Sequence, residues 1–327
     1  MPRTFGFIAA VLALGLGVPA SAQSVPVNEL ASAVVRLNTY INPDARTGGN
    51  LGHQREGSAV VIDSGGLLLT IGYLMVEAQA AEVVTNEGRA VPANIVGYDH
   101  ESGFGLLQAT SPLNIQPIQM GSSAELKEGQ TAAIIGAGGV RRIAAVEVVS
   151  RREFAGNWEY LLDQAIFTTP AYPNWSGTAL VNAEGKLVGI GSLIVGDAGR
   201  KGAPLPGNMF VPIDRLPPIL GDMLATGHAG VATPWLGITT EEGRRGLVVA
   251  RPVVGGPAEK AGIRRGDVIV GVDGRQAEDL ADFYRKVRAL GSAGVTVPLD
   301  IEREGTKQRV DIPSINRRDH LKLNSTL

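Results

Sequence analysis

Ser176 is the residue whose type and position in this sequence first suggest a chemical reaction. It precedes Gly177 in a stretch that begins at Pro173 and runs into the apolar residues 179–181. A serine hydroxyl is a poor nucleophile at its ordinary pKa, so acyl transfer requires an adjacent general base, which a carboxylate usually orients. Ser176 is therefore a candidate nucleophile only if the fold brings a base to its hydroxyl.

The histidines are the first candidates for that base: His53, His100, His228 and His320. Three of them lie in a glycine-rich loop, in a segment of small residues and near the end of the chain, so we expect them at the surface. His100 is flanked by Asp99 and Glu101, but we expect it to lie away from Ser176. A lysine can also activate a serine, and the candidates have the surroundings of surface lysines: Lys127, Lys186 and Lys201.

The N-terminal residues predict export. Arg3 supplies a short positive region, residues 5–18 are almost wholly apolar or glycine, and Ala20-Ser21-Ala22 has the small-x-small form that signal peptidase accepts. No later segment approaches the roughly 20 apolar residues of a membrane span. The sequence therefore predicts a cleaved signal peptide over residues 1–22 and a protein of the bacterial periplasm or a secreted one, with no membrane span after the signal is removed.

Composition excludes several classes of function. The chain of 327 residues has no cysteine, which rules out disulfides and thiolate metal sites, and its formal net charge is −2. An exported protein of this kind must rely on an ordinary hydrophobic core. Because the arginine pairs are scattered and form no basic stripe, we expect no nucleic-acid partner. No cofactor and no metal site are predicted.

The elements that must position Ser176 are short strands. From Ala33 to Pro217 the sequence alternates β-prone runs with turn residues, and hairpin-type turns are predicted at residues 63–66, 86–88 and 182–185. This spacing predicts an all-β barrel or sandwich. Short helices are expected at residues 28–33 and 213–226.

The pattern changes after a stretch of small residues and helix breakers at 227–234, which has the composition of a linker. Residues 235–238 and 246–251 are expected strands, 256–262 a short capped helix, and 267–272 a strand that ends in an Asp-Gly turn. Helical periodicity at residues 280–290 places Leu280, Phe283, Val287 and Leu290 on one stripe. A hairpin over 295–312 follows, and the polar residues 316–327 are expected to be disordered.

The order of these segments resembles the HtrA family of exported serine proteases, in which a trypsin-like double β-barrel precedes a PDZ domain. The resemblance spans about residues 30–316. In the second half it is carried by three motifs: Trp235-Leu236-Gly237-Ile238, Gly256-Pro257-Ala258 and Gly266-Asp267-Val268-Ile269. In the first half it is carried by residues 57–63, by Val96-Gly97-Tyr98-Asp99, by Ser176-Gly177 and by Leu187-Val188-Gly189-Ile190.

The resemblance implies a catalytic triad that this chain has lost in part. Ser176 keeps the nucleophile position, but Tyr73 stands at the position of the histidine and Gly103 at that of the aspartate. A tyrosine with a pKa near 10 cannot act as a base at neutral pH, and glycine has no side chain to orient one. Asn174 replaces a glycine whose N–H the family lends to its oxyanion hole, so we expect a reshaped pocket.

The resemblance also implies a peptide-binding groove in the second domain. Trp235, Leu236, Gly237 and Ile238 match the family's carboxylate-binding loop, in which successive backbone N–H groups form a nest for the C-terminal carboxylate of a peptide. One edge of the helix that carries Phe283 and Val287 would line the groove. Those two side chains fit a core stripe equally well, and both interpretations stay open.

We therefore predict a mostly β chain with these parts: signal peptide 1–22, trypsin-like double β-barrel 23–217, linker 218–233, α+β PDZ domain 234–316 and disordered tail 317–327. The predicted function is that of an HtrA-like pseudoprotease that binds unfolded polypeptides or protein C-termini, with a homotrimer implied by the resemblance. The alternative is an active serine endopeptidase that uses Ser176 with a non-standard base. A third interpretation is a structural envelope component whose PDZ groove is filled by its own tail.

Overall fold

The computed structural model describes residues 26–243 and 246–323. The predicted signal peptide, residues 1–22, lies outside these ranges. None of the helices among the described residues is long and apolar enough to cross a membrane.

The first domain begins with a six-stranded closed barrel, in the order β1-β2-β3-β6-β5-β4. Its strands are β1 (Val34–Ile41), β2 (Gln54–Val61), β3 (Leu67–Ile71), β4 (Ala78–Val84), β5 (Ala90–Tyr98) and β6 (Phe104–Ala109). The short helices α1 (Val27–Ser32) and α2 (Gly48–Leu51) lie before β1 and between β1 and β2. Strands that follow one another pair as hairpins within β1-β2-β3 and within β4-β5-β6, and the pairs β3–β6 and β1–β4 close the barrel.

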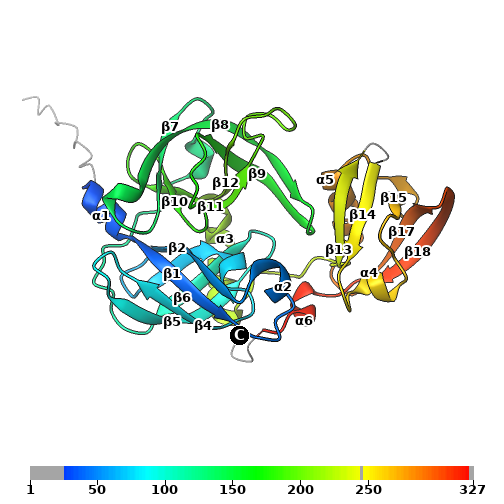
Figure 1. Cartoon of the computed structure of the whole chain (residues 1–327), viewed down its shortest axis with the longest axis horizontal. Coiled ribbons are helices and arrows are strands. Elements are labelled where there is room, and N and C mark those ends of the chain that lie inside the picture. The colour runs from blue at the N-terminus through cyan, green and yellow to red at the C-terminus, as the bar shows by residue number, and fades with distance from the viewer. Residues whose placement is uncertain (1–25, 244–245, 324–327) are drawn as a thin grey trace, which may run out of the picture.

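A second six-stranded closed barrel follows, in the order β10-β11-β12-β9-β8-β7. Its strands are β7 (Thr131–Ile135), β8 (Ile143–Gly156), β9 (Tyr160–Thr169), β10 (Ala179–Val181), β11 (Leu187–Val195) and β12 (Gly207–Pro212). Single turns of 3₁₀-helix lie at η1 (Gly72–Leu74), η2 (Ser123–Glu125), η3 (Val140–Arg142) and η4 (Ile213–Arg215). Figure 1 shows the two barrels side by side, with the strand pair β8 and β9 projecting beyond the second one.

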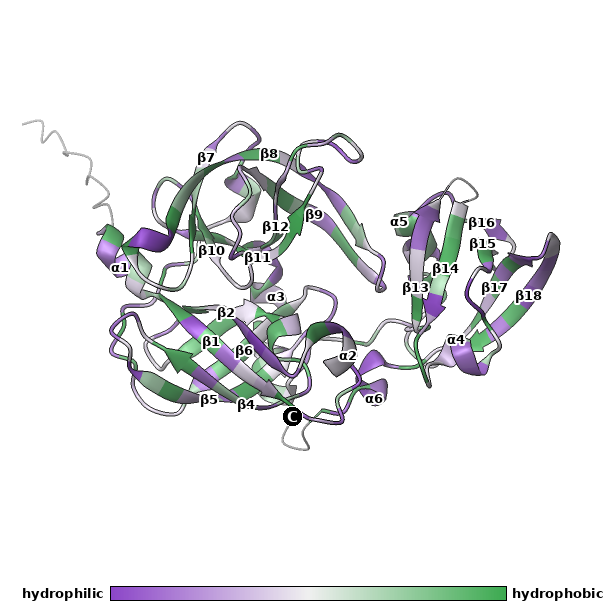
Figure 2. Cartoon of the chain, in the orientation of Figure 1, coloured by the Kyte–Doolittle hydropathy of each residue, from purple (hydrophilic) through white to green (hydrophobic). Residues whose placement is uncertain are grey.

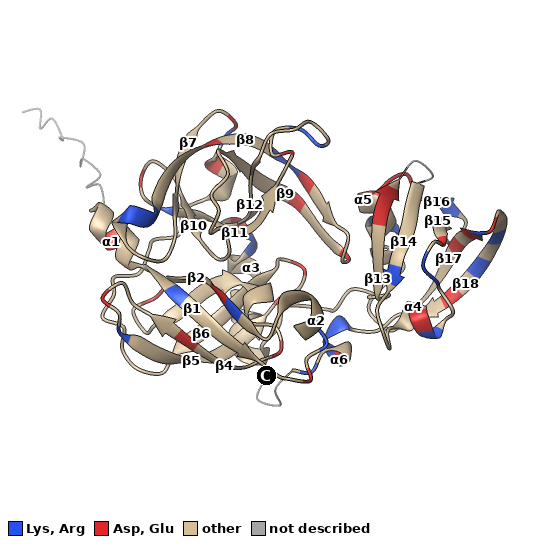
Figure 3. Ribbon diagram, viewed as in Figure 1, with Lys and Arg blue, Asp and Glu red and all other residues tan. Residues whose placement is uncertain are grey.

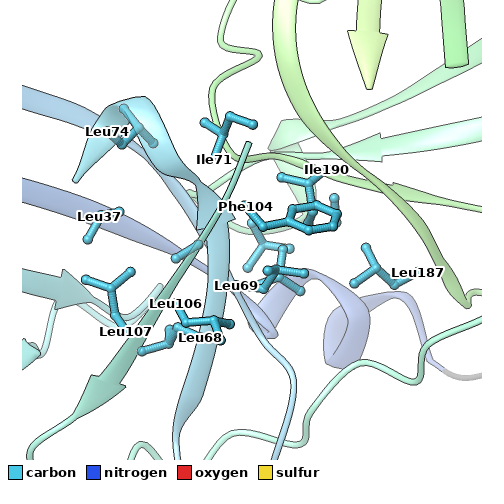
Figure 4. Close-up of a cluster of buried hydrophobic side chains, with 14 of the residues drawn as sticks. Leu37, Leu68, Leu69, Ile71, Leu74, Phe104, Leu106, Leu107, Leu187 and Ile190 are labelled. Atoms are coloured by element: carbon cyan, nitrogen blue, oxygen red, sulfur yellow. The ribbon is translucent and has the colours of Figure 1, made fainter. Parts of the chain in front are cut away.

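The two barrels share one hydrophobic core. Leu69 and Phe104 from the first barrel and Leu187 and Ile190 from the second belong to one cluster of buried side chains. Figure 4 shows these side chains converging between the barrels. Burial of a large apolar side chain contributes about 1.5–3 kcal/mol, so this shared core holds the loops between the barrels in a fixed relation. Figure 2 shows the corresponding alternation of hydrophobic and hydrophilic residues along the strands.

The second domain is a six-stranded sheet in the order β13-β14-β15-β17-β18, with β16 paired to β15. Its elements are β13 (Ile238–Gly243), β14 (Gly246–Pro252), α4 (Pro257–Lys260), β15 (Val268–Val272), β16 (Arg275–Gln276), α5 (Leu280–Arg288), β17 (Thr296–Arg303) and β18 (Thr306–Pro313). The Asp279 side chain caps α5 by accepting a hydrogen bond of 2.7 Å from the Asp282 N–H. The apolar stripe of this helix faces inward, and Phe283 and Val287 are buried. The predicted fold class, mostly β with a double β-barrel before an α+β domain, is confirmed.

Two segments bear on the predicted domain bounds. Residues 218–226, placed in the linker, also belong to the helix expected at 213–226, and that helix forms as α3 (Pro217–Thr226), which packs on β5 and ends at Gly227 in a left-handed conformation. The predicted disorder of the tail is wrong for residues 317–323, since α6 (Arg317–His320) returns to the first barrel. His320 is buried against Trp235, with ring centroids 4.8 Å apart, and the Lys322 N–H donates to Glu77. The tail is ordered because it has apolar and hydrogen-bonding partners in both domains.

Candidate functional site

Ser176 lies in the turn before β10, where the backbone conformation is fixed by Gly177. Gly177 has φ +72°, and a Cβ there would lie 2.0 Å from the Ser58 carbonyl oxygen, so only glycine fits. The Ser58 N–H donates a hydrogen bond of 2.8 Å to the Ser176 carbonyl oxygen and ties the turn to β2. The serine is therefore held by the scaffold of both barrels.

Tyr73 is the hydrogen-bond partner of the serine. It lies on η1, directly after β3, and its hydroxyl is 2.7 Å from Ser176 Oγ and 2.9 Å from the Ser192 carbonyl oxygen. Burial raises the pKa of Tyr73 to about 12, and hydrogen bonds at Ser176 and Trp175 oppose that effect. The phenol remains protonated at neutral pH, so it can share a hydrogen bond with the serine but cannot take its proton.

Gly103 cannot supply the carboxylate that orients a base. Its φ is +80°, its carbonyl oxygen accepts a hydrogen bond of 2.7 Å from the Gly72 N–H, and an added Cβ would lie 3.2 Å from the Tyr160 hydroxyl oxygen. Tyr160 itself donates to the Ser102 carbonyl oxygen over 2.9 Å. The space beside η1 is thus filled by an aromatic side chain.

His100 lies in a different hydrogen-bond network. Its Nδ1 is 2.9 Å from the Tyr98 hydroxyl, its Nε2 is 3.0 Å from the Glu159 carbonyl oxygen, and Arg317 Nη1 is 2.7 Å from Nε2. Burial and, next, the positive charge of Arg317 hold the pKa of His100 well below its usual value. The imidazole is therefore neutral and engaged elsewhere.

The lysine candidates also have other partners or positions at the surface. Lys186 pairs with Glu184 over 2.8 Å, and Lys201 pairs with Glu242 of the PDZ-like domain over 2.9 Å. His53 is exposed. Among the described residues, the hydrogen-bond partner of the Ser176 hydroxyl is Tyr73. The geometry brings Ser176 and Tyr73 together and places Gly103 nearby without a side chain.

The second candidate site is the loop that joins Trp235 to β13. The backbone N–H groups of Leu236, Gly237 and Ile238 all point at one carboxylate, that of Glu159, at 2.9, 2.7 and 2.8 Å. Gly237 has φ +75°, which turns the three amides toward a common point. The loop is therefore built to receive a carboxylate, and the chain itself provides one.

Glu159 was missed by sequence reasoning, because what marks it out is its backbone conformation in the structure. It is the last of three residues that join β8 to β9, and its φ is +61°. Glycine usually takes the left-handed position that ends a three-residue hairpin loop. A glutamate in this left-handed position indicates a contact that stabilises an unfavourable backbone conformation.

A cavity of about 660 Å³ connects the two candidate sites. Its lining includes Tyr73 and Ser176 from the barrels, Trp158 from the β8–β9 turn, and Trp235 and Ile238 from the carboxylate-binding loop. Most of the wall is apolar, as in ligand-binding pockets generally. Figure 3 shows that charged residues are spread over both domains and do not gather into a single basic surface.

Comparison with known proteins supports both halves of the fold. The model of the trypsin-like peptidase domain matches residues 57–190, and the model of the PDZ domain matches residues 234–313. Serine protease PepD of Mycobacterium tuberculosis is 27% identical, over 84% of this chain and 63% of its own length. The periplasmic pH-dependent serine endoprotease DegQ of Escherichia coli is 28% identical, over 78% of this chain and 58% of its own.

The chain spans about three fifths of the length of these curated relatives. Among solved structures, the HtrA-type protease AlgW with decapeptide superimposes with a TM-score of 0.55 and 23% identity. The superposition covers 91% of this chain and 98% of that one. At this identity the likeness establishes the shared fold.

Proposed function

Because this chain belongs to the HtrA-like family of trypsin-like peptidases with a PDZ domain, we propose that it is an exported pseudoprotease. It would bind unfolded polypeptides or protein C-termini through its PDZ groove and act in envelope protein quality control or as an adaptor. Assembly into a homotrimer is part of the proposal on family grounds, and light scattering of the purified chain measures it.

The hydrogen bond between Tyr73 and Ser176 carries the proposal. With its pKa at about 12, Tyr73 is ionised in about one molecule in 10⁵ at neutral pH. Removing its proton at pH 7 costs about 7 kcal/mol, at about 1.4 kcal/mol per pKa unit. A base with that cost does not activate a serine.

The carboxylate-binding loop supports the binding half of the proposal. Its three N–H groups already hold a carboxylate group, so their spacing suits the C-terminus of a peptide. β13 pairs with β14 on one side only, which leaves its other edge for an added strand next to α5. Main-chain pairing gives affinity in such grooves, and a side-chain pocket gives specificity.

An active endopeptidase is the second candidate function. The retained Ser176 faces the apolar cavity, and the relatives are named serine proteases and endoproteases. This candidate requires a base other than His100, whose ring is neutral and bonded to other groups. Labelling by an active-site probe, described in the Discussion, separates the two candidates.

Calorimetry with two synthetic peptides tests the binding proposal. Both end in the same apolar residue, one with a free carboxylate and the other with an amide. A free groove of this kind binds at micromolar Kd, about −8 kcal/mol. We expect the amidated peptide to bind at least tenfold more weakly. Its uncharged amide would face the N–H groups of residues 236–238 in place of a negatively charged carboxylate. Equal affinities would contradict the assignment of the loop.

A further inference from the structure

The groove of the PDZ domain already holds a segment of the same chain. The turn between β8 and β9, residues 157–159, which we call the hairpin tip, lies against the carboxylate-binding loop. The carboxylate of Glu159 accepts three backbone hydrogen bonds there, at 2.7–2.9 Å. A peptide bound in the usual way would place its C-terminal carboxylate on these same N–H groups.

The backbone of the hairpin tip also occupies the strand-pairing position. The Thr240 N–H, on the free edge of β13, donates a hydrogen bond of 3.1 Å to the Asn157 carbonyl oxygen. Asn157 lies two residues before Glu159 in the same turn. The Glu159 side chain thus takes the position of a peptide's C-terminal carboxylate. The Asn157 carbonyl makes the hydrogen bond to β13 that the backbone of an added peptide strand would make.

Helix α5 encloses the hairpin tip from the other side of the groove. The Tyr284 hydroxyl donates to the Gly156 carbonyl oxygen over 2.8 Å and accepts from the Glu159 N–H over 3.1 Å. Arg285, on the same helix, forms an ion pair with Glu153 of β8. Leu161, the second residue of β9, is buried within the hydrophobic core of the PDZ domain. The contact therefore combines backbone, charged and apolar groups.

The ordered tail fixes the hairpin tip in place. Arg317 Nη1 donates a hydrogen bond of 3.0 Å to the Trp158 carbonyl oxygen. The indole ring of Trp158 stacks on Tyr160, with centroids 5.8 Å apart and planes inclined by 13°. These contacts hold Glu159 in its left-handed conformation. In a hairpin without such contacts, glycine usually takes this position.

We propose that the hairpin tip is an internal ligand of the PDZ groove, in which the Glu159 side chain takes the place of a peptide's C-terminal carboxylate. The proposal rests on the proposed function, because it names what a partner's C-terminus must displace. A peptide then binds only to the fraction of molecules whose hairpin tip has left the groove, and its apparent affinity falls by that fraction. Since Trp158 also lines the cavity at Ser176, departure of the hairpin tip changes that cavity as well.

Two substitutions of the full chain test the proposal. Glu159→Gln removes the charge with little change in shape, and Glu159→Gly removes the carboxylate while giving the turn the residue its backbone favours. Glu147→Gln, at an exposed position of the adjoining strand β8, is the matched control. The probe is a synthetic peptide with a C-terminal valine and a free carboxylate. We expect both Glu159 variants to bind it at least tenfold more tightly than the wild type and the control do.

Hydrogen exchange of the backbone N–H groups of residues 236–240, measured without peptide, gives a second readout. Exchange should be slow in the wild type and in Glu147→Gln, and at least tenfold faster in both Glu159 variants. Faster exchange without peptide binding by any variant would support the internal ligand and contradict the proposed function. Measurable peptide binding with equal affinity in wild type and Glu159→Gly, or exchange that is unchanged by loss of the carboxylate, would overturn the internal ligand.

Discussion

Replacing Tyr73 with phenylalanine tests whether this side chain is a structural donor or a base. The substitution keeps the ring and removes the hydroxyl that lies 2.7 Å from Ser176 Oγ and 2.9 Å from the Ser192 carbonyl oxygen. A net intramolecular hydrogen bond contributes about 0.5–1.5 kcal/mol to stability. Near pH 8 we therefore expect Tyr73→Phe to lower the free energy of unfolding by about 1 kcal/mol.

The pH dependence of this difference follows from the pKa of Tyr73. Burial raises that pKa to about 12 in the folded chain, whereas an unfolded tyrosine has a pKa near 10. Between these values the unfolded state loses the proton and the folded state keeps it, so stability falls as pH rises. By about pH 11 the wild type should have lost about 1.4 kcal/mol that Tyr73→Phe does not lose.

Urea unfolding of both proteins at about pH 8, pH 9 and pH 11, followed by circular dichroism, measures this difference. Other tyrosines titrate in both proteins and cancel in the comparison. If Tyr73 instead acted as a base near neutral pH, its pKa in the folded chain would be lowered. The folded state would then lose the proton before the unfolded state, and the wild type would gain stability relative to Tyr73→Phe between about pH 7 and pH 9. A gain of that sign would refute the structural role of Tyr73.

The remaining predictions concern activity at the serine. The wild type should neither cleave unfolded casein nor react with a fluorophosphonate probe, because loss of the base costs a serine protease about 10⁶ in kcat; stoichiometric labelling that Ser176→Ala abolishes would establish the endopeptidase instead. Restoring Tyr73→His and Gly103→Asp together should leave turnover well below that of an active relative. The backbone at residue 103 has φ +80°, which is unfavourable for a residue with a side chain, and that side chain would crowd Tyr160. Asn174 also leaves an imperfect oxyanion hole, which alone can cost about 10²–10³ in rate. Turnover of the double variant that equals the relative's would contradict this account.

Local sequence patterns predicted an all-β barrel or sandwich, and the family resemblance narrowed this to a double β-barrel before a PDZ domain. Alternating apolar residues and Gly-rich turns predict strands, because each hairpin is formed by neighbours in the chain. The stripe of residues 280–290 predicts α5 for the same reason. The types of residues 73, 103 and 176 also follow from the sequence, and with them the expectation that no histidine serves as base. The strands and the helix need only spacing and residue type, whereas the roles of residues 73 and 103 also need the family resemblance.

Tertiary structure decided which groups meet. Tyr73 and Ser176 come from different barrels and touch only because the two barrels share a core. The partner of the carboxylate-binding loop, Glu159, lies 77 residues before Leu236 in the chain, and no local pattern links them. Such contacts depend on how the two domains dock. That docking is set by burial of Leu161 and by hydrogen bonds between distant segments, which sequence periodicity does not encode.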